Sequence, residues 1–497
     1  MSRKVPIFYN ALLLTGVNLL LRLVSTSFQV FISGRLGAAG VGLLQLVMSV
    51  GGLAMTAGMA GIRTTSMYLT AEELGKHRPG NVTWVLRSCL IYSLVCSGSL
   101  ALGLLMGAPY IAAHWIGNTE TIGAIRLFAV FLPAVCMCGC MTGYFTAANR
   151  IGMLAAVEIL EQLASMAVTM SALLLWARED PGRACQSVVL GSGVGGCLTL
   201  SLLLFLRLWE RQKPGPRIPT ARRLLRTAVP LALADDLKVG INTVENLMVP
   251  RRLALFPGSR DPLADFGRVS GMVFPVLMFP AAILFALADL LIPELARCNA
   301  AGSRRRIQYL AKRSLRLALL YGCLCGGGMY LLAEVLCQWL YASSEAGFML
   351  RLYSTLAPML YCDAITDAMN KGLGQQNTAV RYNILTATLD VLGLFILLPR
   401  LGMTGYFISF LITHLLNFLL SLRLLTRTAG ISIPFYVPAL TLAATLAAVY
   451  GAGLVGSPWG RIIAYLGILG SLLVLFGIVS RRDIRWIQGL MFRNANS

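Results

Sequence analysis

The sequence predicts an all-α polytopic membrane protein of about fourteen transmembrane helices, arranged as two pseudo-symmetric six-helix lobes with two extra C-terminal helices. Three observations support this fold class. The 497 residues are 57% hydrophobic and only 13% charged, which is more apolar surface than a soluble domain can bury. The charges concentrate in short segments between long apolar runs. The chain also resembles itself at an offset of 225 residues.

The apolar runs are long enough to cross a bilayer as helices. At about 1.5 Å per residue, each can span about 30 Å of hydrocarbon. A segment that is isolated in lipid must satisfy its own backbone hydrogen bonds, so each run is expected to be helical. The fourteen runs are 8–32, 41–69, 82–107, 124–147, 153–176, 187–209, 227–256, 268–293, 309–333, 349–372, 378–400, 403–427, 434–455 and 459–480.

The repeat rests on sparse identities that keep one register. Arg126-Leu127-Phe128, five residues before Pro133, recurs as Arg351-Leu352-Tyr353, five residues before Pro358. The same offset pairs Gly42 with Gly267, Ala71 with Ala296, and Ile159-Leu160 with Ile384-Leu385. Four regions follow: a first lobe at 1–209, a cytoplasmic linker at 210–221, a second lobe at 222–427, and two further helices with a basic tail at 428–497.

The distribution of lysine and arginine predicts the orientation. Twenty-six of them lie near one set of helix ends and nine near the other, so both termini are expected in the cytoplasm and the protein in the plasma membrane. The net charge of +21 could also indicate nucleic acid as a partner. That interpretation is disfavoured because the charges follow the pattern of membrane topology.

The sequence contains no set of residues typical of an enzyme or a metal site. The twelve cysteines form no CxxC pair and the three histidines are scattered, so small packing residues are the simpler interpretation. No Walker lysine motif occurs. We therefore expect a protein that is not an enzyme, with no cofactor and no metal.

Polar side chains inside the runs mark candidate functional faces. They recur at helical spacing, which puts those of each helix on one face. Because a charge at mid-membrane costs at least about 2.5–3.5 kcal/mol, these faces cannot point at lipid. One interpretation is a buried polar seam that only fixes packing; the other is a hydrated central cavity lined by runs 1, 2, 7 and 8. The residues are Asn18, Arg22, Ser25 and Gln29; Arg63; Asp235, Lys238, Asn242 and Glu245; and Asp289.

Several loop motifs resemble a known family. They are Gly61-Ile62 with Ala71-Glu72, Val249-Pro250-Arg251-Arg252-Leu253, Ile292-Pro293-Glu294, Gly372-Leu373-Gly374-Gln375, and Leu397-Leu398-Pro399-Arg400-Leu401-Gly402 with Gly405-Tyr406. Their order and spacing are similar to those of the stage V sporulation protein B group, in the multidrug/oligosaccharidyl-lipid/polysaccharide (MOP) exporter superfamily.

The resemblance implies a flippase that works by alternating access. Its cargo would be a polyprenyl-diphosphate-linked glycan, such as a lipid II-like peptidoglycan precursor for the cell wall or spore cortex. By this resemblance Arg22 would bind the diphosphate, and runs 13 and 14 would form a groove for the lipid tail. The substrate cavity would comprise Asn18, Arg22, Ser25, Gln29, Arg63, Lys238 and Asn242. Membrane lipids are further expected partners, and a monomer is the expected state.

Two other functions fit the same sequence. In an antiporter of the same fold, Asp235, Glu245 or Asp289 would bind H⁺ or Na⁺ and exchange it for a cationic drug. A non-transporting scaffold for wall enzymes would instead depend on its loops rather than on its cavity.

Overall fold

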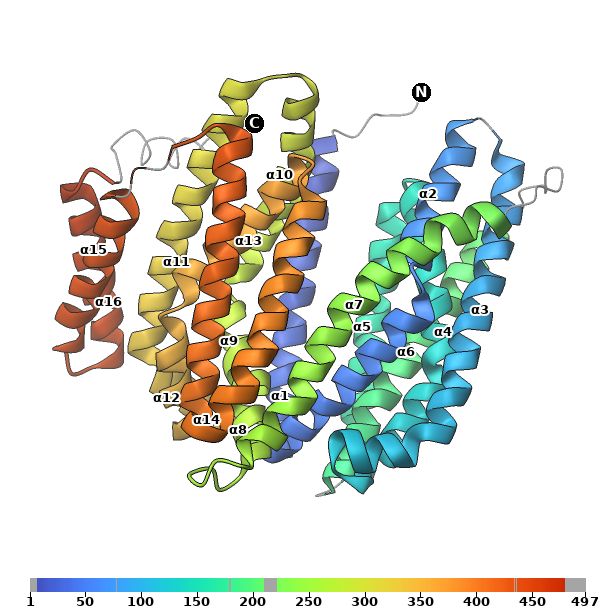
Figure 1. The fold of residues 1–497 in the computed structure, drawn as a ribbon, viewed down its shortest axis with the longest axis horizontal. Helices are drawn as coiled ribbons and strands as arrows, with labels where there is room; N and C mark the ends of the chain where they lie inside the picture. Colours follow the sequence, from blue (N-terminus) through green and yellow to red (C-terminus); the bar gives the residue numbers. More distant parts are fainter. Residues whose placement is uncertain are drawn as a thin grey trace. The chain divides into compact units, whose positions relative to one another are not determined.

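The structure is a computed structural model that describes residues 7–76, 78–177, 180–209, 221–432, 434 and 436–478. All regular secondary structure in these residues is helical (Figure 1). The predicted linker at 210–221 and the tail beyond residue 478 lie outside the described residues, except for Ala221. The helices are α1 (Ile7–Met59), α2 (Ile62–Gly75), α3 (Pro79–Tyr110), η1 (Ile111–Ile116), η2 (Thr119–Thr121), α4 (Ile122–Ala147), α5 (Ile151–Ala172), η3 (Leu173–Ala177), α6 (Pro181–Trp209), α7 (Ala221–Leu253), α8 (Pro262–Gly267), η4 (Arg268–Val273), α9 (Phe274–Met278), α10 (Ala281–Ala300), α11 (Arg304–Tyr341), α12 (Ser344–Ser354), α13 (Ala357–Gly372), α14 (Gln376–Ala429), α15 (Tyr436–Gly453) and α16 (Pro458–Leu475).

The helix boundaries repeat at the offset that the sequence predicts. The following pairs each lie 225 residues apart: the ends of α2 and α10, the starts of α3 and α11, the ends of η1 and α11, the starts of η2 and α12, the ends of α4 and α13, and the starts of α5 and α14. Sparse identities therefore mark a real structural repeat, because loop positions are kept even where side chains differ. The fold consists of two like sets of helices followed by α15 and α16.

Packing divides the chain into two compact units whose borders differ from those of the repeat. The first unit comprises residues Met1–Gly271 with Asp390–Tyr406, and the second comprises Met272–Leu389 with Phe407–Ser497. Helix α7, at the start of the second sequence lobe, packs with the first unit. Its residues Leu224 and Ala228 join a buried cluster with Ile62, Cys89 and Tyr144 from α2, α3 and α4.

Two glycines separate runs that sequence analysis treats as distinct helices. Gly37 interrupts α1 with φ 67°, and Gly402 interrupts α14 with φ 59°. Both follow an Arg-Leu pair, and both adopt a backbone conformation that residues with a Cβ atom disfavour. Each long helix therefore contains two helical segments, as the predicted runs require.

The helices of the structure that meet length and composition criteria for a membrane span are fewer than the fourteen apolar runs. Among the described residues, nine helices are long and apolar enough to cross a membrane, or ten if the bent pair Pro262–Met278 and Ala281–Ala300 is one span. Each of the two kinked helices counts once in this number, α7 carries many charges, and α12–α13 is broken at Thr355–Leu356. Fourteen crossings are compatible with these helices.

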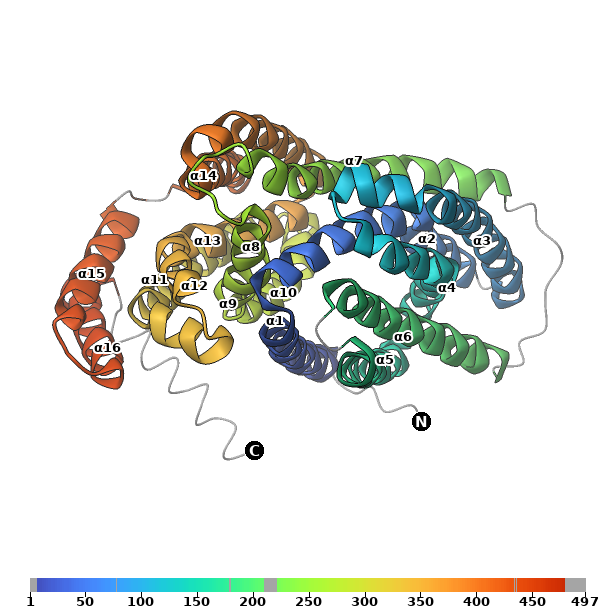
Figure 2. The same ribbon diagram turned by 90° about the horizontal axis from the view of Figure 1, so that it is seen from below.

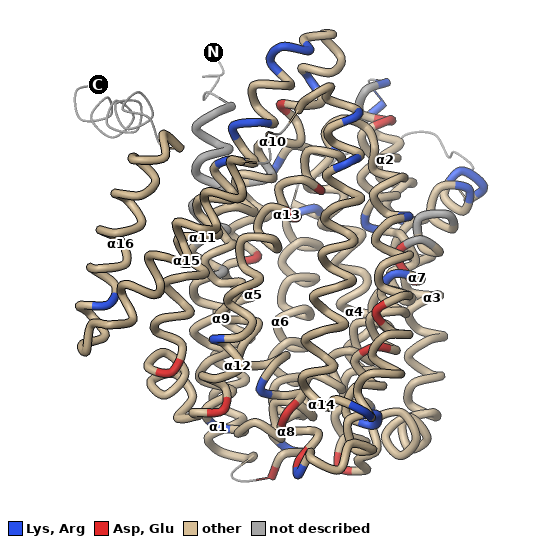
Figure 3. Tube along the Cα trace, turned by 60° about the vertical axis from the view of Figure 1, so that its left-hand side comes forward, with Lys and Arg blue, Asp and Glu red and all other residues tan. Residues whose placement is uncertain are grey.

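Charges gather mainly toward helix ends, and long uncharged stretches lie between them (Figure 3). The C-terminal pair α15–α16 stands beside α11, as Figures 1 and 2 both show. The Tyr465 hydroxyl donates to the backbone oxygen of Cys323 over 2.7 Å and is buried. Gly327 leaves room for this ring, because a Cβ at that position would lie 2.2 Å from the hydroxyl oxygen.

Candidate functional site

The polar faces of α1 and α7 meet inside the first unit. The Thr243 hydroxyl donates to the backbone oxygen of Ser49 over 3.2 Å, and the Asn246 amide donates to the Ser49 hydroxyl over 2.9 Å. The contact between the second and seventh predicted runs is therefore present. It uses Thr243 and Asn246, each one residue beyond the predicted Asn242 and Glu245.

The predicted residues of α7 form a stripe that this unit does not cover. Asp235, Lys238 and Asn242 are exposed, and Glu245 is half-buried. They recur at steps of 3, 4 and 3 residues along one helix face. In the described part of the chain, no ion pair joins Lys238 to Asp235.

The predicted residues of α1 are described only in part. The Ser25 hydroxyl is half-buried and donates to the Leu21 backbone oxygen over 2.8 Å, so its own helix satisfies it. Gln29 is half-buried. The side chains of Asn18 and Arg22, and that of Asp289 on α10, lie outside the described part, so their roles stay predictions.

Arg63 is exposed near the start of α2 and lies within electrostatic range of Glu158 on α5. Nearby, the Glu161 carboxylate accepts a hydrogen bond from the Thr199 hydroxyl of α6 over 2.7 Å. Both acids are half-buried. An acid inside an apolar run is itself a sequence signal of a polar environment, because a charge that faces lipid is costly.

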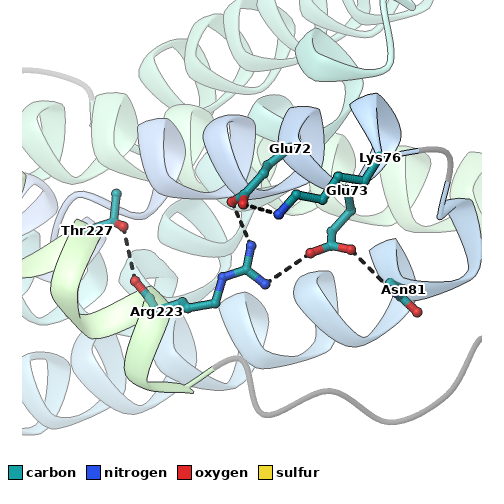
Figure 4. A network of polar contacts seen from close by, with 6 residues as sticks. All are labelled: Glu72, Glu73, Lys76, Asn81, Arg223 and Thr227. Carbon is teal, nitrogen blue, oxygen red and sulfur yellow. Dashed lines mark hydrogen bonds and ion pairs between the residues drawn. The ribbon is translucent and has the colours of Figure 1, made fainter.

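A charged network joins α2 to the start of α7 (Figure 4). Arg223 donates to Glu73 over 3.0 Å and to Glu72 over 2.6 Å. Asn81 donates to the other oxygen of Glu73 over 3.1 Å, and Lys76 pairs with Glu72. Glu73 is only 2% exposed, so its charge depends on these partners. The sequence contained Ala71-Glu72 as a family motif but gave no indication of its partner 151 residues away.

A second set of acids lies in the second unit, between α13 and the C-terminal half of α14. One oxygen of Asp363 accepts from Asn417 over 3.1 Å, and Asp367 pairs with Lys371 over 2.6 Å. Asn370 is fully buried and donates to the Ser421 backbone oxygen over 2.9 Å. Among the described residues, Asp363, Asp367 and Asn370 each retain a buried oxygen without a hydrogen-bond partner. Their spacing of 4 and 3 residues places them on one face of α13.

The cysteines and the other possible metal ligands are spread over several of the described helices. Within the described ranges, no group of three or more His, Cys, Asp or Glu side chains is arranged to hold a metal ion. The twelve cysteines are free. What the two units offer is charge-bearing faces on apolar helices, which can recognise a charged solute or ion.

Residues 7–253 match the family model for polysaccharide biosynthesis proteins. The chain is 22% identical over 416 residues to stage V sporulation protein B of Bacillus subtilis, covering 79% of this chain and 78% of that protein.

Solved structures share the fold at lower identity. The lipid II flippase MurJ, in an inward closed conformation, is 12% identical with a TM-score of 0.69, over 93% of this chain and 98% of that one. An inward-facing multidrug resistance transporter of the MATE family is 13% identical with a TM-score of 0.66, over 84% of this chain and all of that one. These findings confirm the resemblance that the loop motifs indicate: the protein is a multi-pass membrane protein with the fold of the MOP superfamily, similar to stage V sporulation protein B and, in its first half, to the polysaccharide biosynthesis proteins.

Proposed function

We propose that the protein is a flippase that moves a lipid-linked oligosaccharide or peptidoglycan precursor across the plasma membrane by alternating access. The curated relative is a sporulation protein and one similar structure is a lipid II flippase, so cell-wall or spore-cortex synthesis is the proposed context. We propose that both termini lie in the cytoplasm, as the excess of positive charge at one set of helix ends supports. We also propose that the protein acts as a monomer.

The observation that carries the proposal is the exposed stripe Asp235–Lys238–Asn242 on α7. Against lipid, each charge would cost at least about 2.5–3.5 kcal/mol. The stripe therefore faces water or a polar solute during the transport cycle. It provides a cation, an anion and an amide on one face, which suits a hydrated headgroup that carries both charge and sugar hydroxyls.

The lipid tail stays in the bilayer while the headgroup crosses through the polar cavity. Arg22 and Arg63 offer charge-assisted hydrogen bonds to the diphosphate. The half-buried Ser25 and Gln29 lie further along α1 from Arg22 and supply neutral polar contacts for the glycan. This mechanism needs no covalent chemistry, so the protein is a transporter rather than an enzyme.

The test is a headgroup-accessibility assay in reconstituted vesicles that contain a polyprenyl-diphosphate-linked glycan. We expect Arg22→Ala/Arg63→Ala to lose most of the flipping. The matched control is Arg304→Ala/Arg305→Ala, which removes two arginines at the start of α11 and should flip normally. Full flipping by the Arg22/Arg63 variant would refute the role of the arginines, and mass spectrometry of the copurified lipid would identify the cargo.

The alternative function, a cation-coupled drug antiporter, draws support from the acids of the second unit. Asp363 and Asp367 each keep a buried oxygen without a hydrogen-bond partner, so a proton or Na⁺ would satisfy them. They supplement the predicted coupling acids Asp235, Glu245 and Asp289. Cation-dependent export of a cationic drug by the purified protein would favour this function over lipid flipping.

A scaffold without transport activity makes the opposite prediction about charge. Reversing Lys238 and Asp235 would leave such a protein functional, whereas changes in the loops would abolish its role. Loss of growth or sporulation function in the charge-reversed protein, at normal expression, would argue against the scaffold.

A further inference from the structure

The second unit contains an apolar pocket of about 470 Å³ between α11, the α12–α13 junction, the C-terminal half of α14 and α15. Its volume lies in the range of small-molecule sites. Helix α15 lines the pocket, but no residue of α16 does. It therefore differs from the groove expected between runs 13 and 14 for the tail of a transported lipid.

The pocket has a basic end and an apolar end. Lys312 and Arg316 lie one turn apart on α11, and Leu315 and Leu319 extend the same lining face. Lys312 is eight residues from the start of α11, about 12 Å along its axis, and Leu319 is deeper still. The residues that line the pocket include no aspartate or glutamate.

The other walls of the pocket have the same orientation relative to its basic end. Gln308 donates to the Gly430 backbone oxygen over 2.9 Å, which places the end of α14 beside the start of α11. The lining residues Leu422 and Pro434 lie near this end, whereas Leu411 and Leu442 lie further along their helices. Lys312 and Arg316 thus lie at one end of the pocket, and leucines line its inner part.

We propose that this pocket binds one anionic glycerophospholipid of the cytoplasmic leaflet. Its phosphate contacts Lys312 and Arg316, and an acyl chain extends toward Leu319 and Leu442. Arg313, the residue after Lys312, adds to the local positive potential that attracts anionic lipid. A polyprenyl tail of many isoprene units would leave most of its length outside, so the pocket suits a resident phospholipid better than the transported lipid.

Such a lipid would join α15 to the helices it faces. The polar contacts of Tyr465 and Gln308 hold the pair α15–α16 and the end of α14 against α11, and the lipid fills the apolar space between these elements. Binding does not depend on what the protein transports, so it can be tested separately from flipping.

The test uses the full-length protein in neutral detergent and native mass spectrometry. The probes are phosphatidylglycerol and phosphatidylcholine with identical acyl chains. We expect one phosphatidylglycerol to bind about tenfold or more tightly than phosphatidylcholine. The preference should disappear in Lys312→Gln/Arg316→Gln and weaken in Lys312→Gln alone, which changes only an exposed side chain.

The matched control, Arg304→Gln/Arg305→Gln, changes the net charge equally but touches no lining residue, so it should keep the preference. Equal binding of the two lipids by the unmodified protein, or a preference that survives in the Lys312/Arg316 variant, would overturn the proposal. Displacement of phosphatidylglycerol by an equivalent amount of a polyprenyl diphosphate would assign the pocket to the cargo and would also overturn it.

Discussion

Replacing Arg223 with methionine removes the central cation of the network that joins α2 to α7 while keeping a long apolar stem. Glu73 would then lose its 3.0 Å ion pair and keep only the hydrogen bond from Asn81. Glu72 would keep Lys76. Because Glu73 is 2% exposed, water cannot replace the lost partner.

The expected loss of stability follows from the burial of the Arg223–Glu73 pair. Removing one partner of a fully buried pair costs about 3–5 kcal/mol, whereas an exposed pair contributes about 0.2–1 kcal/mol. The side chain of Arg223 is 35% exposed and that of Glu73 is 2% exposed, so the pair lies between these limits. We expect Arg223→Met to lower the free energy of unfolding by about 2–4 kcal/mol.

Unfolding in mixed micelles with a denaturing detergent, followed by fluorescence, measures this loss. The matched control is Arg226→Met, an exposed arginine on the same helix without a partner in the network, which should change stability by less than about 0.5 kcal/mol. A double-mutant cycle with Glu73→Gln should give a coupling energy of at least about 1 kcal/mol. If the stability changes of the two single variants add up to that of the double variant, the inference that this pair joins the two helices is refuted.

Two further predictions concern the second unit. Gly327→Ala should displace the Tyr465 ring, because the added Cβ would lie 2.2 Å from the hydroxyl oxygen. We expect it to destabilise the packing of α11 against α16 by about 1–3 kcal/mol in the same unfolding assay. The matched control is Gly328→Ala, whose added Cβ would lie 4.0 Å from its nearest neighbour, and this substitution should be nearly neutral. Asp363→Asn should keep the contact with Asn417 but lose the ionisable group. The dependence of transport on H⁺ or Na⁺ should therefore weaken while protein yield stays normal. Unchanged cation dependence would exclude Asp363 as a coupling residue.

The candidate site was only partly accessible from the sequence. Helical spacing placed Asp235, Lys238 and Asn242 on one face, and the structure shows that face exposed. Spacing could not show that Ser49 bonds Thr243 and Asn246, because small polar residues inside a helix give no sign of which neighbour they contact. The acids of α13 were equally visible in the sequence, but their unpartnered oxygens were not.

The helical class, the division into apolar runs and the repeat at 225 residues can all be derived from the sequence. These features are local: a helix in lipid satisfies its own backbone, so its length and limits follow from its own residues and from breakers such as Gly37 and Gly402. The pairing of Arg223 with Glu73, the contact of Asn417 with Asp363, and the pocket that α11 and α15 line are visible only in the folded protein. Such contacts join residues far apart in the chain, and only the packing of whole helices determines which of many chemically possible partners come within bonding distance.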